Sequence, residues 1–156
     1  MSAENNKLNI STVREFNLDR YLGTWYEIAR FNHRFERNLT NVKANYSLKD
    51  NGMIKVVNTG FNSEQKRNSK IIGKAKTTKT TGLLKVSFFL FFYSSYRVLA
   101  LGDNYEWALV GAGKSDKYLW ILSRTEAMPK ETLSAILSEA DQRGYDTKKL
   151  IYNQPS

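Results

Sequence analysis

Leu84-Lys85-Val86-Ser87-Phe88 alternates apolar and polar side chains from one residue to the next. In a β-strand, successive side chains point to opposite faces of the sheet, so Leu84, Val86 and Phe88 should share one face. That face is suited to a core, and the polar face is suited to water. The segment therefore predicts a strand of an antiparallel sheet, because such sheets commonly bury one face and solvate the other.

Segments of this kind recur along the chain. Each is rich in β-branched and aromatic residues, and turn formers such as Asp50-Asn51-Gly52 and Gly102-Asp103-Asn104 separate them. The predicted strands are Trp25–Phe31, Asn41–Leu48, Ile54–Phe61, Lys70–Lys76, Leu83–Phe89, Tyr96–Leu101, Tyr105–Gly111 and Tyr118–Ser123. Their hairpin spacing predicts an all-β fold, an eight-stranded antiparallel up-and-down β-barrel over about residues 22–124. Such a barrel is just wide enough to be filled by side chains or to hold one small ligand.

One helix is predicted after the barrel, over about residues 129–143. Pro129 suits a first helical position, and Gly144 suits the position just past the last turn. Apolar residues recur between them at three- and four-residue steps, namely Leu133, Ile136, Leu137 and Ala140. The helix should bury this face on the outside of the barrel, where a short last strand, 150–152, could pair with an edge. We expect one domain spanning residues 1–156.

Alternation along the strands also predicts which residues line the barrel. The lining mixes large aromatic residues with small ones such as Ala44, and such a mixture can leave volume for a ligand. Small-molecule sites are mostly apolar with a few placed polar groups, as this lining is. The alternative is that the aromatic residues fill the barrel as core. The predicted ligand-binding residues are Phe35, Ala44, Tyr46, Ile54, Val56, Asn58, Leu84, Val86, Phe88, Tyr96, Val98, Tyr118 and Trp120. In the last barrel strand, Leu119 and Ile121 have the opposite parity, as a strand beneath the helix requires.

The composition narrows the classes of partner. Lys and Arg number 24 against 15 Asp and Glu, a formal net charge of +9, so anionic partners are attracted at long range. The basic residues are spread along the chain without a block of like charges, which favours a solvated surface. No nucleic-acid partner is therefore expected, although a basic barrel that binds nucleic acid or an anionic membrane surface on its exterior remains the alternative. The N-terminal stretch lacks the pattern of a signal peptide, and no apolar run could span a membrane, so the chain as written reads as soluble.

Catalytic and metal sites are not predicted. The chain has no Cys and one His, and no nucleophile, phosphate-loop or zinc-binding motif is present, so we expect no enzyme, metal or cofactor. His33 is expected to be a surface or hinge histidine, with Glu36 as its one acidic neighbour. Arg30, Arg34 and Arg37 surround it, and Arg34 and Arg37 are candidates for holding the head group of an amphiphile. An ordinary solvated basic loop is the alternative.

Leu22-Gly23-Thr24-Trp25-Tyr26-Glu27-Ile28-Ala29-Arg30 resembles the Gly-x-Trp signature that opens the first strand of lipocalins. Residues 44–48, 84–89 and 118–125 also match that family, in order and with similar spacing. The chain is most similar to the bacterial outer-membrane lipocalins related to apolipoprotein D, over about residues 16–152. In the loop between the predicted sixth and seventh strands, Gly102 stands where the family usually has Asp, although Asp103 is adjacent.

The resemblance implies a carrier or store of fatty acids or lysophospholipids held inside the barrel. It implies that Gly23, Trp25 and Arg124 close the base, with the guanidinium stacked on the indole. It also implies the periplasm or outer membrane, with a lipid anchor on a Cys that this chain lacks, and a monomer or weak homodimer. The aromatic run 88–93 could offer a patch to a membrane surface or second subunit if exposed; burial in the barrel rim is the alternative.

Overall fold

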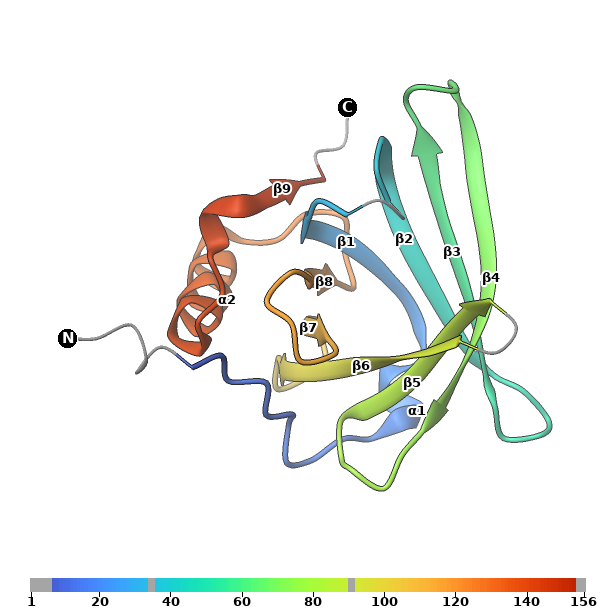
Figure 1. Ribbon diagram of the computed structural model, residues 1–156, viewed down its shortest axis with the longest axis horizontal. Coiled ribbons are helices and arrows are strands. Elements are labelled where there is room, and N and C mark those ends of the chain that lie inside the picture. The colour runs from blue at the N-terminus through green and yellow to red at the C-terminus, as the bar shows by residue number, and fades with distance from the viewer. Residues whose placement is uncertain (1–6, 34–35, 90–91, 154–156) are drawn as a thin grey trace.

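The computed structural model describes residues 7–33, 36–89 and 92–153, and these form an antiparallel β-barrel with one helix packed outside it (Figure 1). The barrel strands are β1 (Gly23–Phe31), β2 (Leu39–Leu48), β3 (Ile54–Asn62), β4 (Arg67–Thr77), β5 (Leu83–Phe89), β6 (Phe92–Leu101), β7 (Trp107–Ala112) and β8 (Leu119–Ser123). Consecutive strands pair from β2 to β8, β8 pairs with β1, and β1 pairs back with β2 to close the ring. The predicted fold class is therefore confirmed.

The strand bounds differ from the prediction where turns intervene. Tyr105 has φ 56° and lies in the β6–β7 turn, so β7 begins at Trp107. Tyr118 precedes β8, and β4 begins three residues before the predicted Lys70. The first two shifts arise because turn residues can carry strand-like side chains, and the third arises because the polar residues Arg67, Asn68 and Ser69 extend a strand.

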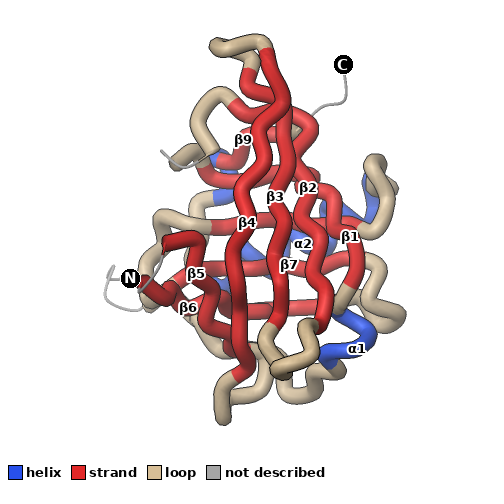
Figure 2. The backbone as a smooth tube through the Cα atoms, turned by 90° about the vertical axis from the view of Figure 1, so that its right-hand side faces the viewer, coloured by secondary structure: helices blue, strands red, loops and turns tan. Residues whose placement is uncertain are grey.

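The short helix α1 (Leu18–Tyr21) was not predicted, because four residues are too few to show a helical period. Asn17 begins it by accepting a hydrogen bond from the backbone N–H of Arg20. Figure 2 shows α1 beneath the lower ends of β1 and β2. We call this end of the barrel the closed end and the opposite end the mouth.

The helix α2 (Lys130–Arg143) packs on the outer face of the barrel, as predicted. Pro129 is its N-cap rather than its first helical residue, and Gly144 ends it in the left-handed region at φ 103°. Its buried residues Ile136 and Ala140 form one cluster with outward-facing residues of the barrel wall, namely Ala29, Phe31, Leu99, Leu109, Leu119 and Ile121. The 3-10 turn η2 (Thr147–Lys149) leads into β9 (Leu150–Tyr152), which pairs antiparallel with residues 29–31 of β1.

A second apolar cluster lies inside the barrel and contains the inward-facing residues of the same strands. In β8, Leu122 and Trp120 belong to this inner cluster, whereas Leu119 and Ile121 face α2. The strand is thus apolar on both faces because each face meets a different core.

Candidate functional site

The base of the barrel is closed by a stacked cation. The guanidinium carbon of Arg124 lies 3.8 Å from the ring centroid of the buried Trp25. Its nitrogens donate to three backbone carbonyls, those of Thr24 at 3.0 Å, Arg20 at 2.6 Å and Tyr105 at 3.3 Å. Gly23, at φ 102°, leaves room beside the guanidinium, since a Cβ there would lie 3.3 Å from Arg124 Nη1. The contact implied by the family motif is therefore present.

The half of the barrel near the closed end is filled by its own side chains. The inward-facing residues there are almost completely shielded from solvent, and they include Trp25, Ile54, Val56, Ala75, Leu84, Val98, Ala108 and Val110. Predicted lining residues Ile54, Val56, Leu84 and Val98 belong to this packed layer. In this half the side chains fill the barrel as core, which was the alternative to a ligand site.

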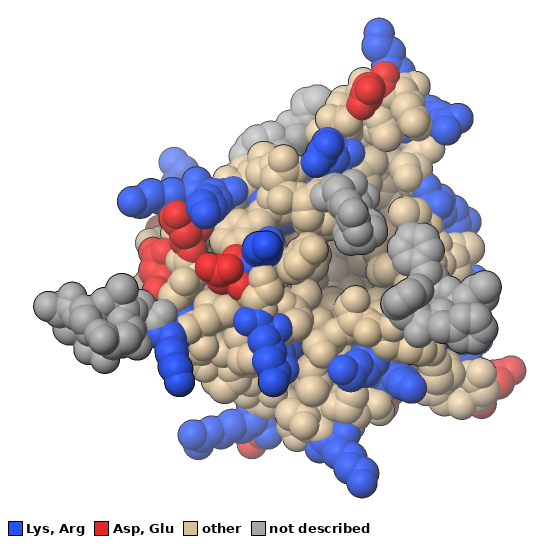
Figure 3. Space-filling model, viewed as in Figure 1, with Lys and Arg blue, Asp and Glu red and all other residues tan. Residues whose placement is uncertain are grey.

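The half near the mouth is different, because inward-facing side chains there keep contact with solvent. Ile71 is paired with Asn58, which shares the inward face of β3 with the core residue Val56, so Ile71 faces inward. Ile71 is nevertheless 43% exposed. Five further inward residues are partly buried rather than buried: Ala44, Asn58, Val86, Phe88 and Trp120. Figure 3 shows a recess in the middle of this face of the molecule. We call this solvent-reached space the hollow.

Three tyrosines of the inner cluster meet through their hydroxyl groups inside the barrel, and we call them the tyrosine floor: Tyr21 of α1, Tyr46 of β2 and Tyr96 of β6. The hydroxyl of Tyr96 is hydrogen-bonded to that of Tyr21 and accepts a bond of 3.2 Å from Tyr46. Burial is the main cause that raises the pKa of all three phenols, that of Tyr46 to about 12. All three therefore stay neutral at physiological pH.

A buried ionic cluster lies inside the barrel near the mouth. A bulge in β1 between Glu27 and Ala29 lets both Glu27 and Arg30 face inward, opposite Leu122 and Trp120 of β8. Arg30 Nη1 donates to Glu27 Oε1 at 2.7 Å, and Nη2 donates to the backbone carbonyl of Glu36 at 2.8 Å. Arg30 is thus committed to the protein and does not join a basic rim.

Glu36 joins this cluster from the loop after β1. Its Oε1 lies 2.7 Å from His33 Nε2 and accepts a bond of 2.8 Å from Trp120 Nε1. Burial alone would raise the pKa of Glu36, but the bonds from His33, Glu27 and Trp120 lower it to about 2. Burial and the neighbouring Glu36 raise the pKa of Glu27 well above its usual value. The pKa values of the two carboxyl groups are therefore shifted in opposite directions.

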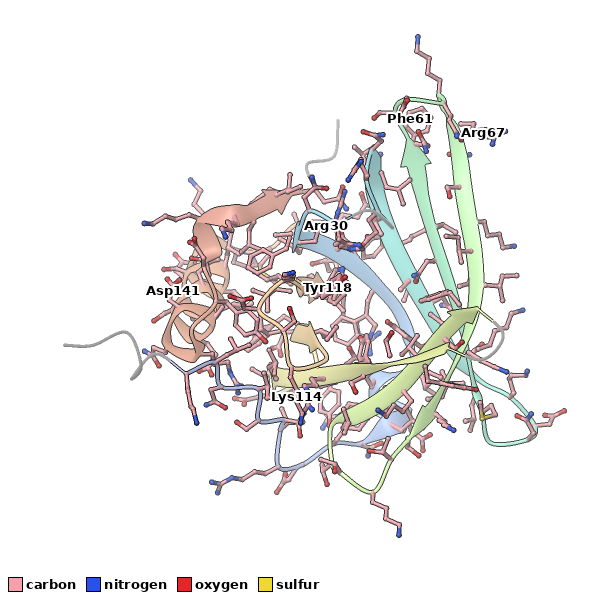
Figure 4. All side chains as sticks on the ribbon, viewed as in Figure 1. Arg30, Phe61, Arg67, Lys114, Tyr118 and Asp141 are labelled. Atoms are coloured by element: carbon pink, nitrogen blue, oxygen red, sulfur yellow. The ribbon has the colours of Figure 1, made fainter. Side chains whose placement is uncertain are left out.

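His33 is not the surface residue that was expected as one of two readings. Its side chain is 10% exposed, and its ring centroid lies 5.5 Å from those of both Tyr118 and Trp120. Tyr118 stacks on Trp120 with 6.1 Å between centroids, and Figure 4 shows Tyr118 and Arg30 within the ring of strands. Phe61 and Arg67, in contrast, lie at the far tip of the β3–β4 hairpin.

The remaining predicted site residues divide by position. Arg37 is exposed, while Arg34 and Phe35 lie outside the described residues, as does the middle of the aromatic run 88–93. Tyr21, Ile71 and Glu36 are inward-facing residues that the sequence did not single out as lining. Ile71 lies in the predicted strand Lys70–Lys76 with the same parity as the inner-cluster residue Ala75, so parity would have found it, whereas no local pattern places Tyr21 or Glu36.

Two surface clefts lie elsewhere on the described part of the molecule. One of about 530 Å³ lies at the closed end between Phe16, Arg20, Leu101 and Tyr105. One of about 110 Å³ lies where β1 and β2 part, beside Tyr26 and Asn153. Across the view of Figure 3, Lys and Arg side chains are spread out rather than gathered into one patch.

Within residues 7–33, 36–89 and 92–153, no group of three or more His, Asp or Glu is placed to hold a metal ion. No helix in the same ranges is long and apolar enough to cross a membrane.

Comparison with known proteins gives matches over almost the whole chain. Residues 16–155 match a family described as a lipocalin-like domain. The outer membrane lipoprotein Blc of Citrobacter freundii is 48% identical over 145 residues, 92% of this chain and 81% of that protein. Its namesake from Escherichia coli (strain K12) is 47% identical over 147 residues, 93% and 82% of the two chains. Apolipoprotein D of Macaca fascicularis is 36% identical over 144 residues, 86% and 75% of the two chains.

A solved structure shows the same fold at low sequence identity. The allergen Per a 4 from cockroaches superposes with a TM-score of 0.77 over 97% of this chain and 96% of that chain, at 18% identity. At this identity the likeness concerns the fold alone.

Proposed function

The chain belongs to the lipocalin family, and from that membership we propose that the hollow binds a fatty acid or lysophospholipid, for transport or storage. The observation that carries the proposal is the half-exposed state of inward-facing apolar residues near the mouth, above all Ile71. An acyl chain lying against them would remove this surface from water, at about 0.8 kcal/mol for each buried methylene before costs. Long chains can thus bind without many polar contacts.

The head group would lie at the mouth, where Arg34 and Arg37 are the candidate partners. Arg37 is exposed and Arg34 is outside the described residues. Guanidinium groups pair with phosphate and carboxylate oxygens through two parallel hydrogen bonds. Arg30 is not part of this proposal, because its guanidinium is already bound to Glu27 and to backbone carbonyls.

We further propose that the protein acts by binding and performs no reaction, as a single domain and a monomer or weak homodimer. The relatives named outer membrane lipoproteins support a location at the periplasm or outer membrane. A membrane surface is then a natural second partner.

A matched pair of substitutions tests the binding site. Ile71 and Ile72 are adjacent in β4, but Ile71 faces the hollow and Ile72, 54% exposed, faces outward. We expect Ile71→Trp to weaken hexadecanoic acid binding at least about tenfold by occupying the hollow, and Ile72→Trp to leave it unchanged. Isothermal titration calorimetry measures both affinities. Equal affinities in the two variants would contradict binding in the hollow.

The head-group assignment needs a separate comparison. We expect the double variant Arg34→Ala, Arg37→Ala to lose affinity for a lysophospholipid while its affinity for an uncharged monoacylglycerol is retained. An equal loss for both lipids would remove the two arginines as head-group ligands. Organic extraction of the purified protein followed by mass spectrometry identifies the ligand carried from the cell.

A further inference from the structure

We propose that the tyrosine floor, formed by Tyr21, Tyr46 and Tyr96, is a polar subsite for a neutral ligand oxygen, a hydroxyl or carbonyl at the end of the ligand that enters first. The inference rests on the proposed function and specifies the class of ligand. The preferred ligand is then an oxygenated lipid rather than one that ends in a plain hydrocarbon tail.

The three hydroxyls converge from separate parts of the fold. Tyr21 comes from α1 at the closed end, and its ring centroid lies 5.8 Å from that of Tyr46 and 6.4 Å from that of Tyr96. Tyr46 and Tyr96 come from opposite walls, with centroids 6.1 Å apart. Their hydroxyls meet at Tyr96, which bonds to both of the others.

The cluster carries one hydrogen more than its own hydrogen bonds use. Three hydroxyls carry three hydrogens, and the two hydrogen bonds among them use two. The third O–H, on Tyr21 or Tyr96, therefore needs an acceptor from outside the cluster, and a ligand oxygen or a water can supply it.

The position of the cluster says what can supply the acceptor. Tyr21 and Tyr46 are 1% and 6% exposed, whereas Tyr96 is only partly buried. Tyr96 pairs with Leu84, two residues along β5 from Val86, which borders the hollow. An atom at the bottom of the hollow can therefore reach the floor. A ligand hydroxyl could also donate to a phenol oxygen, so it would both accept and donate there.

The chemistry of the floor favours a neutral oxygen over a carboxylate. Burial raises the pKa of all three phenols, so they are neutral donors, and one spare hydrogen cannot solvate a buried anion. Arg124, the nearest cation below, is occupied by Trp25 and by backbone carbonyls. A carboxylate or phosphate would stay at the mouth, and the oxygen at the floor would belong to the other end of the ligand.

Two probes that differ by one oxygen test the subsite: hexadecanoic acid and 16-hydroxyhexadecanoic acid. In a hollow with an apolar bottom, the buried hydroxyl would weaken binding at least about tenfold. We expect the wild-type protein to bind the hydroxy acid as tightly as hexadecanoic acid, or more tightly. A tenfold preference for hexadecanoic acid in the wild type overturns the inference, whatever the variants do.

The variant Tyr21→Phe, Tyr46→Phe, Tyr96→Phe removes the hydroxyls and keeps the ring volumes. We expect the ratio of the two dissociation constants to shift by at least threefold toward hexadecanoic acid, while Tyr152→Phe, outside the barrel in β9, leaves the ratio unchanged. A smaller shift would contradict the subsite and would mean that the three hydroxyls make no contact with the ligand. Failure of the wild type to bind either acid would instead contradict the proposed function.

Discussion

Arg124 and Arg30 illustrate how single residues combine charge with burial in this barrel. Arg124 lies flat on Trp25 and donates to backbone carbonyls of α1, of β1 and of the β6–β7 turn. Its guanidinium thus holds these three segments together at the base of the barrel. Arg30 lies 5% exposed inside the mouth half and pairs with Glu27. The first role followed from a family motif. The second depends on the β1 bulge, which no sequence pattern revealed.

At this scale, we expect Arg124→Lys to lower the free energy of unfolding by about 1–2 kcal/mol. Lysine keeps the charge but loses the planar stacking and the fixed fork of donors. Urea unfolding followed by fluorescence measures the change. Arg37→Lys, at an exposed position, serves as the control and should stay within about 0.5 kcal/mol of the wild type. Similar values for both variants would mean that the stacked guanidinium contributes little.

The barrel strands separate two apolar cores, one inside the barrel and one between the barrel wall and α2. Side-chain alternation sends every second residue inward, and the outward residues of β6, β7 and β8 meet α2. The helix therefore stabilises the wall without touching the hollow. Its amphipathic spacing was readable in the sequence, whereas the exact start of the helix, at Lys130 after Pro129, required the backbone.

We expect Ile136→Ala to destabilise the protein by about 2–4 kcal/mol, because the side chain is 1% exposed and its removal leaves a cavity beneath α2. Ser138→Ala, at an exposed position of the same helix, is the matched control and should change stability by less than about 0.5 kcal/mol. Thermal unfolding by circular dichroism compares the variants. Affinity for hexadecanoic acid should be equal in both, and a selective loss in Ile136→Ala would contradict the separation of wall and hollow.

For the whole molecule, the tyrosine floor links stability to alkaline pH. The folded phenols hold their protons above the usual pKa near 10, to about 12 for Tyr46, while the unfolded chain has released them. The folded state thus binds more protons in this window, so stability falls as pH rises from 10 to 12. We expect a smaller fall in the triple Phe variant, measured by urea unfolding at pH 8 and pH 11. Parallel falls in both proteins would show that the floor does not control this response.

The sequence by itself indicated the eight strands and the outer helix, while the resemblance to lipocalins, which the family matches confirm, implied the closing Trp25–Arg124 contact. The strands and the helix follow from local alternation and helical spacing, so neighbouring residues carry them. Tertiary structure decided the depth of the hollow, the burial of His33 and the meeting of hydroxyls 50 and 75 residues apart. They depend on strand register, a bulge and a four-residue helix, because only closure of the ring brings distant side chains to one height inside it.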